Sequence, residues 1–426
     1  MQRSRAGTRD ATGRRVLASS AALAAALTCA AAYAETDGVK IGDGRLRPSL
    51  EAETHHVYNP GYLPRGLDPT ADYYIVARPR ATLDFPSDQL DLKLAADLEY
   101  RQFMGASNPG TSGLSTFAGQ FDTGLHINKL SPVSMRVHET TVRSGDPDNQ
   151  TLGARMLHTS NLVGLGLDVR PGGGALIFAV DYALIYDRFD SDNEGTPRAL
   201  TNLRQLPQLK ATWHFLPRTA ILLEADGVLT TYPEHVSYPG GGGNVPVYLL
   251  RTYLGAVGSL TPRIDFLLKA GYGDTLLETD DNYRSAVGQM ELTYRLKETA
   301  KLRGGYVRTA EPVALYKYFG LDRAYLRFSQ LLWGRTSIEA ALEYQHLGFG
   351  KAVVAPNTPR TDHAFAAELT VAHSFKNWLT LALVERFELR RSDYRSPDDF
   401  SSDYTHNDLY MRLSCNLDAL AAAFRN

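Results

Sequence analysis

The sequence lacks the features that mark several large protein classes. It has only two cysteines, Cys29 and Cys415, and no Cys/His spacing that would predict a zinc site. Its formal net charge is −2, which argues against a nucleic-acid-binding protein, since such proteins are usually basic. No linker or low-complexity tract divides the 426 residues. These absences favour one large structural unit and predict neither a metal site nor a nucleic-acid partner.

The first 34 residues have the pattern of a cleaved secretory signal. Arginines up to position 15 precede an apolar, alanine-rich stretch over 16–31, and Ala32-Tyr33-Ala34 matches an A-x-A cleavage site. After this region no stretch approaches the roughly 20 apolar residues that a transmembrane helix needs. We therefore predict export and removal of residues 1–34. Cys415 would then be the only cysteine, and no disulfide could form within the chain.

Period-two alternation runs along nearly the whole remaining sequence. From Leu90 to Arg101, apolar residues alternate with polar, mostly charged ones, which places them on opposite faces of a strand. A soluble sandwich could contain one or two such strands, but recurrence along the chain is typical of a transmembrane barrel. One misfit is Glu385, which falls on the apolar side of its strand and would fit at a bulge or near the membrane interface.

Connection lengths set the strand number. About nine long polar connections alternate with about eight tight turns, which implies about eighteen strands with both ends on one side. We therefore predict an all-β fold: a transmembrane antiparallel up-and-down β-barrel of the bacterial outer membrane. Residues 35–45 would be a short periplasmic lead, and residues 46–426 the barrel. No connection, including the one over 311–320, is long enough to be an obvious constriction loop, which favours an open or partner-gated channel.

Side chains on the polar register should face a water-filled lumen, and aromatic residues near strand ends should form two interfacial girdles. The girdle candidates include Tyr73, Tyr74, Trp213 and Phe375. Lumen residues of both charges could be held in cross-strand salt bridges, or could form a ring that handles polar or anionic cargo. The predicted pore-lining residues are Arg78, Arg80, Lys93, Asp97, Glu99, Arg101, Arg251, Glu291, Arg295, Arg303, Arg323, Arg327, Glu339, Glu343, Arg386 and Arg412.

A catalytic function receives little support. The histidines are scattered, none has a metal-ligand spacing on a helix, and no motif singles out a nucleophile with a base. We predict no enzyme and no cofactor, with an outer-membrane hydrolase or an adhesin barrel as weaker alternatives.

The opening of the predicted mature chain resembles the β-barrel porin type 2 family. The resemblance rests on Gly38-Val39-Lys40-Ile41-Gly42, followed by Leu46-Arg47-Pro48-Ser49-Leu50-Glu51. It implies an outer-membrane porin of the exopolysaccharide-export type. Such a pore would pass a secreted polysaccharide, and a periplasmic polysaccharide-export protein would be its partner.

Two function classes therefore compete. One is an export pore for an exopolysaccharide or capsule; the alternative is a general or solute-selective diffusion porin. Either would contact outer-membrane lipid and depend on the barrel-assembly machinery. The polar residues favour a pore over an enzyme because they line whole strands rather than converge on one point. Export is favoured over diffusion only by the resemblance.

Overall fold

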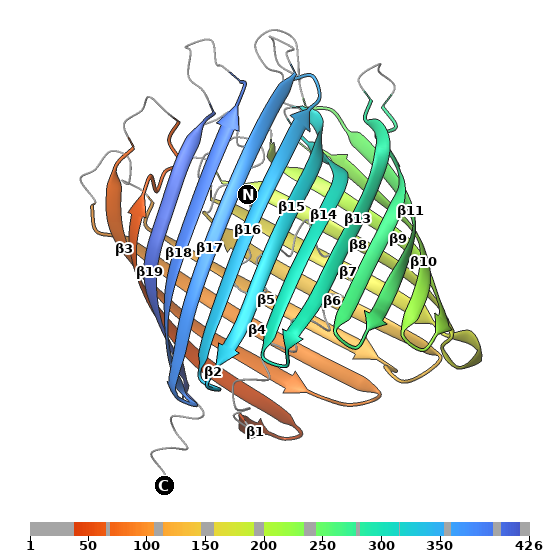
Figure 1. Ribbon diagram of the computed structural model, residues 1–426, viewed down its shortest axis with the longest axis horizontal. Coiled ribbons are helices and arrows are strands. Elements are labelled where there is room, and N and C mark those ends of the chain that lie inside the picture. The colour runs from red at the N-terminus through yellow and green to blue at the C-terminus, as the bar shows by residue number, and fades with distance from the viewer. Residues whose placement is uncertain are drawn as a thin grey trace.

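The fold was analysed in a computed structural model (Figure 1). It describes residues 38–64, 69–105, 114–145, 157–190, 200–233, 244–277, 282–314, 316–352, 359–394 and 402–417, so the predicted signal lies outside the described residues. The strands are β1 (Val39–Ile41), β2 (Gly44–Tyr58), β3 (Ala71–Phe85), β4 (Leu90–Phe103), β5 (Thr116–Ile127), β6 (Val133–Ser144), β7 (His158–Val169), β8 (Leu176–Phe189), β9 (Asn202–Leu216), β10 (Thr219–Thr231), β11 (Val247–Thr261), β12 (Ile264–Asp274), β13 (Arg284–Lys297), β14 (Ala300–Val313), β15 (Lys317–Leu332), β16 (Thr336–Phe349), β17 (Arg360–Lys376), β18 (Leu379–Ser392) and β19 (Tyr404–Asn416). A 3-10 turn, η2, covers Pro171–Gly173. Among the described residues, no helix is both long and apolar enough to cross a membrane.

Each strand from β2 to β19 pairs antiparallel with the next, and the sheet closes on itself. The closing seam joins β19 to β2, from Asn407 opposite Tyr58 to Asn416 opposite Ser49. The short β1 pairs with the start of β2 and adds no strand to the wall. Within the described residues the wall therefore has eighteen strands, which confirms the predicted antiparallel barrel and its strand number.

The two faces of the wall differ as the alternation predicts. On β4, Glu99 and Arg101 are buried and point inward, whereas the alternate residues Leu98 and Tyr100 are 63% and 39% exposed on the outside. Large apolar side chains are exposed on the outward register of most other strands as well. A soluble monomer rarely exposes such a continuous apolar surface, whereas contact with lipid would cover it.

The two ends of the barrel also differ. Tight turns, such as those at 217–218, 262–263 and 377–378, join the strands at the lower end in Figure 1. Most connections at the upper end are longer, and the last strand, β19, ends on the side of the tight turns. The predicted alternation of long and short connections is thus present. In bacterial outer-membrane barrels, the end with the longer connections usually faces outside the cell.

The prediction that Tyr74 belongs to an interfacial girdle was wrong. Tyr73 is 61% exposed on the outer face, but the adjacent Tyr74 is 3% exposed and points into the lumen. Adjacent strand residues face opposite sides, so both could not join one girdle.

Leu342 offers a test of the register. It lies midway along β16, is 47% exposed on the outer face, and faces Leu326 and Ala367 on the neighbouring strands. Replacing Leu342 with Arg is expected to destabilise the folded barrel by about 2–4 kcal/mol if this position lies at the bilayer midplane. Chemical unfolding in lipid vesicles measures the change. Glu343→Ala, at the inward-facing neighbour, is the control and should cost much less; equal costs would contradict the assignment.

Candidate functional site: the lumen

Every predicted pore-lining residue lies on the inward register, but the set divides by burial. Arg78, Glu99, Arg101, Arg251 and Arg386 are buried by neighbouring side chains. Lys93 and Arg295, near the end with the tight turns, are exposed. A lining role in transport stays a prediction for each of them.

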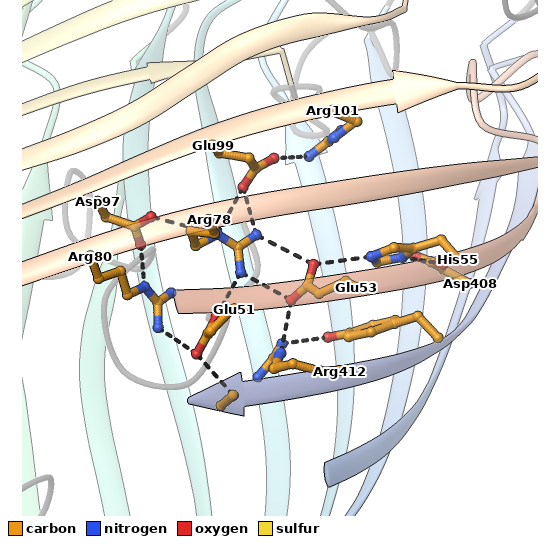
Figure 2. A network of polar contacts seen from close by, with 12 residues as sticks. Glu51, Glu53, His55, Arg78, Arg80, Asp97, Glu99, Arg101, Asp408 and Arg412 are labelled. Carbon is orange, nitrogen blue, oxygen red and sulfur yellow. Dashed lines mark hydrogen bonds and ion pairs between the residues drawn. The ribbon is translucent and has the colours of Figure 1, made fainter. Parts of the chain in front are cut away.

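The largest cluster is a network of ion pairs on the wall formed by β2, β3 and β4 (Figure 2). Arg78 lies at its centre with a side chain only 1% exposed. Its Nη1 donates to Glu53 Oε1 at 2.9 Å and to Glu51 Oε2 at 3.0 Å, and its Nη2 donates to Glu99 Oε2 at 2.6 Å. Three carboxylates on two flanking strands thus surround one guanidinium, and this geometry suits its fixed array of donors.

The network continues across the closing seam to β19. Arg412 donates from Nε to Glu53 Oε1 at 2.8 Å. The ring of His55 lies between two carboxylates, with Nε2 3.0 Å from Glu53 Oε2 and Nδ1 2.9 Å from Asp408 Oδ1. Tyr74 and Tyr410 stack on the two faces of this ring, at 4.0 and 4.3 Å between centroids. The seam is therefore joined by side chains as well as by the backbone ladder.

Sequence reasoning missed the role of His55 and Asp408. The alternation along β2 could have predicted that His55 faces the lumen, because it has the same parity as Glu51 and Glu53, whereas His56 faces outward. The sequence could not place Asp408 within hydrogen-bonding distance of His55, because the two residues meet only across the closing seam, where Asp408 lies opposite Val57.

The second feature is the hairpin of β14 and β15, in which β14 separates from β13 at the upper end while β15 stays paired with β16 up to Phe319 opposite Phe349. Pairing between β13 and β14 stops at Gly288 opposite Arg308, although β13 begins at Arg284 and β14 continues to Val313. Beyond this point β14 pairs only with β15, up to Val313 opposite Lys317. We call residues 309–314 and 316–321 the hairpin tip.

The hairpin tip lies inside the barrel. Ala310 has the same parity as the outward-facing Arg308, yet it is fully buried. It packs in one cluster with inward-facing residues of β7 to β11, among them Leu162, Ile185 and Leu249. The outer face of β14 can meet the inner face of that wall only if the tip has moved into the lumen.

The turn of the hairpin extends this contact to neighbouring strand ends. Ala314 packs with Leu200 and Tyr232, which lie beside β9 and β10, and Phe189 of β8 lies against the same cluster. The expectation that no connection constricts the channel was wrong. The segment over 311–320 is mostly strand, and it narrows the lumen because it bends rather than because it is long.

A buried arginine of the β10–β11 wall, Arg251, contacts the hairpin tip from one side. Arg251 of β11 donates from Nη1 to Thr309 Oγ1 and to the carbonyl oxygen of Ala310, both at 3.0 Å. Its Nε donates to Asp226 of β10 at 2.7 Å, so the carboxylate fixes the guanidinium on the wall. On the other side, Arg360 of β17 lies over the ring of Tyr316 at 5.8 Å. Polar contacts from two separate parts of the wall thus reach the tip.

A group of arginines lies below the tip on the same two strands. Arg303 is directly opposite Arg327, and its Nε is 3.6 Å from Glu291. Arg323 and Arg327 both lie over the ring of Tyr325, at 5.5 and 5.6 Å. Neither of these two arginines forms an ion pair with a described residue. Glu291 lies beside Arg303, and Glu311 interacts with Arg323. Counted against these two carboxylates, the three arginines leave an excess of positive charge in this part of the lumen.

No catalytic arrangement emerges from these clusters. Within the described ranges, no three or more His, Cys, Asp or Glu side chains are placed to hold a metal ion.

The chain was compared with family models, curated proteins and solved structures. No family model matches the chain, and no curated protein matches it. Among solved structures, Pseudomonas aeruginosa OpdO has a TM-score of 0.49 at 13% identity and covers 87% of this chain and 97% of its own. Pseudomonas aeruginosa OccK2 (OpdF), in complex with glucuronate, has a TM-score of 0.47 at 11% identity and covers 87% of this chain and 98% of its own. Acinetobacter baumannii OccAB4 has a TM-score of 0.45 at 9% identity, with the same two coverages. At such low similarity, no residue of this chain inherits a role. The resemblance to the type 2 family stays a prediction.

Proposed function

We propose that the protein is a solute-selective diffusion pore of the bacterial outer membrane. The observation that carries this proposal is the hairpin tip, which occupies part of the lumen and is held there by Arg251. An exported polysaccharide needs a wide, continuous wet path, whereas a small solute needs only a polar passage beside the tip. The apolar outer face and the alternation of connections support the outer-membrane location.

The partly unpaired arginines below the tip support a preference for anionic solutes. Arg323 and Arg327 present guanidinium groups to the lumen, and such groups bind carboxylates and phosphates in a planar, bidentate manner. The acidic residues Glu339 and Glu343 lie on the adjacent β16, so a solute carrying both charges would be oriented as it passes.

The direct test is Arg323→Gln/Arg327→Gln in planar bilayers under a salt gradient. A unit charge about 4 Å from an ion in water contributes about 1 kcal/mol, which corresponds to about a fivefold change in local anion concentration. We therefore expect the anion-to-cation permeability ratio, read from the reversal potential, to fall by about that factor. Arg308→Gln, which removes an outward-facing charge from the same hairpin, is the control. An unchanged ratio in the double variant would remove the proposed anion preference.

Deletion of the gene distinguishes the proposed diffusion pore from the export alternative. A strain lacking this protein should keep normal extracellular polysaccharide and lose uptake of small anionic solutes. The opposite result, loss of surface polysaccharide with normal solute uptake, would favour an export pore that works with a periplasmic polysaccharide-export protein.

A further inference from the structure

The outer face of the barrel carries a polar patch where β6, β7 and β8 reach the upper rim. The cross-strand register arranges it in rows. Arg143, Thr159 and Arg188 form the top row, and Thr141, Asn161 and Tyr186 form the row below. The next row is Glu139, Val163 and Leu184, of which Val163 is 45% and Leu184 37% exposed. The outer wall thus changes from polar to apolar within three rows.

The top two rows enclose a hollow. It has a volume of about 340 Å³ and is lined by Arg143, Thr159, Asn161, Tyr186, Arg188 and Asp190. Such a volume can hold a phosphate with part of a sugar ring. The hollow opens on the outside of the barrel and is separate from the lumen, because all its strand residues have outward parity.

The side chains of the hollow are partly organised. Arg143 donates from Nη1 to Thr159 Oγ1 at 3.0 Å, and its Nη2 is 2.8 Å from Asp190 Oδ2. Arg188 is held loosely, with Nε 3.9 Å from Asp190 and a side chain 70% exposed. Two guanidinium groups face one carboxylate, so the hollow has an excess of one positive charge. This excess favours an anionic ligand, and the fixed Arg143 would need little reorganisation to bind one.

The lower edge of the patch limits the ligand further. Asn161 donates to Glu139 Oε1 at 3.0 Å and to Thr141 Oγ1 at 2.7 Å, so Glu139 is already hydrogen-bonded. Directly beneath lie exposed apolar residues, including Val163 and Leu165. A ligand that fits both the polar rows at the rim and the apolar wall beneath them has a charged, hydroxyl-rich head and acyl chains.

We propose that this patch binds the phosphorylated glycolipid headgroup of the outer leaflet. Arg143 and Arg188 would hold a phosphate, Thr159 and Asn161 would contact sugar hydroxyls, and Tyr186 would lie at the level of the interface. The inference is independent of what the pore conducts. It requires only that the barrel lies in an outer membrane with its longer connections outside.

The test uses the full protein in detergent, titrated with purified lipid A carrying both phosphates and with its dephosphorylated form. Native mass spectrometry gives the affinities. Arg143→Gln/Arg188→Gln should bind the phosphorylated lipid at least about tenfold more weakly, since the variant cannot form the charge-assisted hydrogen bonds. Arg284→Gln/Arg308→Gln is the matched control: it removes two outward-facing rim arginines from β13 and β14, and its affinity should equal that of the wild type.

Several outcomes would overturn the proposal. These are equal affinity of the wild type for both lipids, no weakening in the double variant, or an equal weakening in the control. Competition by inorganic phosphate at low millimolar concentration would point to a free anion as the ligand instead. Conversion of a lipid-free oligomer to monomers by the double variant would identify the patch as an interface between copies of this chain.

Discussion

The variant Arg251→Gln/Asp226→Asn is expected to conduct more than the wild type and to admit larger solutes. Arg251 donates two hydrogen bonds to the hairpin tip, one of them to a backbone carbonyl, and hydrogen bonds to charged groups contribute about 1.5–3 kcal/mol each. Removing roughly 3 kcal/mol moves the balance between an inward and a released tip by about a hundredfold. Replacing Asp226 as well avoids leaving its buried carboxylate without a partner. The variant also removes the ion pair between Arg251 Nη1 and Glu311 of the tip, at 3.8 Å, which acts in the same direction.

Single-channel recording and vesicle swelling with solutes of graded size measure this effect. Conductance should rise several-fold or fluctuate between two levels, and the size limit should increase. Glu224→Gln/Lys269→Gln is the matched control. It neutralises another buried ion pair, between β10 and β12, in which Lys269 Nζ lies 3.2 Å from Glu224 Oε1, and neither residue belongs to the cluster that packs against Ala310. If the control changes the channel as much as the Arg251 pair does, the tip is not what limits passage.

The architecture could be predicted because its signals are local. The parity of a strand and the length of a turn are set by a few neighbouring residues, so Leu90–Phe103 could be read as a half-apolar strand without knowledge of its partners. The parity rule was misapplied only to Tyr74, whose neighbour Tyr73 already occupied the outer face.

Glu385 shows a limit of that local reading. The sequence suggested a bulge or a position near the interface. The ladder is in fact regular there, with Glu385 opposite Leu369 on one side and Leu409 on the other. The carboxylate remains on the outer face and accepts a hydrogen bond from Asn407 at 2.5 Å. Its partner comes from the next strand, so the single-strand pattern could not reveal it.

The inward bend of the hairpin could not be predicted for a similar reason. Nothing in the local sequence of β14 distinguishes Ala310 from any small residue on an outer face. Its burial depends on Leu162, Ile185 and Leu249, which come from strands β7, β8 and β11. The inward position of the tip is therefore a property of contacts between distant segments, and the proposed selectivity of the lumen depends on it.

The buried network around Arg78 should contribute most to the stability of the closing seam. Arg78→Ala removes the central cation shared by Glu51, Glu53 and Glu99. Each carboxylate then keeps one arginine on its other side, namely Arg80, Arg412 and Arg101 respectively. Removing one partner of a buried ion pair typically costs about 3–5 kcal/mol, because the remaining charge stays desolvated. We expect an unfolding free energy lower by about this amount. It can be measured by urea titration in lipid vesicles and by the temperature at which the folded band disappears on gels.

Arg80 provides the comparison within the same network. It lies 2.9 Å from Glu51 and 2.8 Å from Asp97, much as Arg78 lies beside its own carboxylates, but its side chain is 33% exposed rather than 1%. In Arg80→Ala, water can therefore hydrogen-bond to these carboxylates in place of the guanidinium, and the cost should be about 1 kcal/mol or less. The two arginines lie two residues apart on the same face of β3, so a difference in cost would reflect burial rather than position. If both variants are destabilised equally, desolvation is not what makes the network important, and the seam must depend mainly on its backbone ladder.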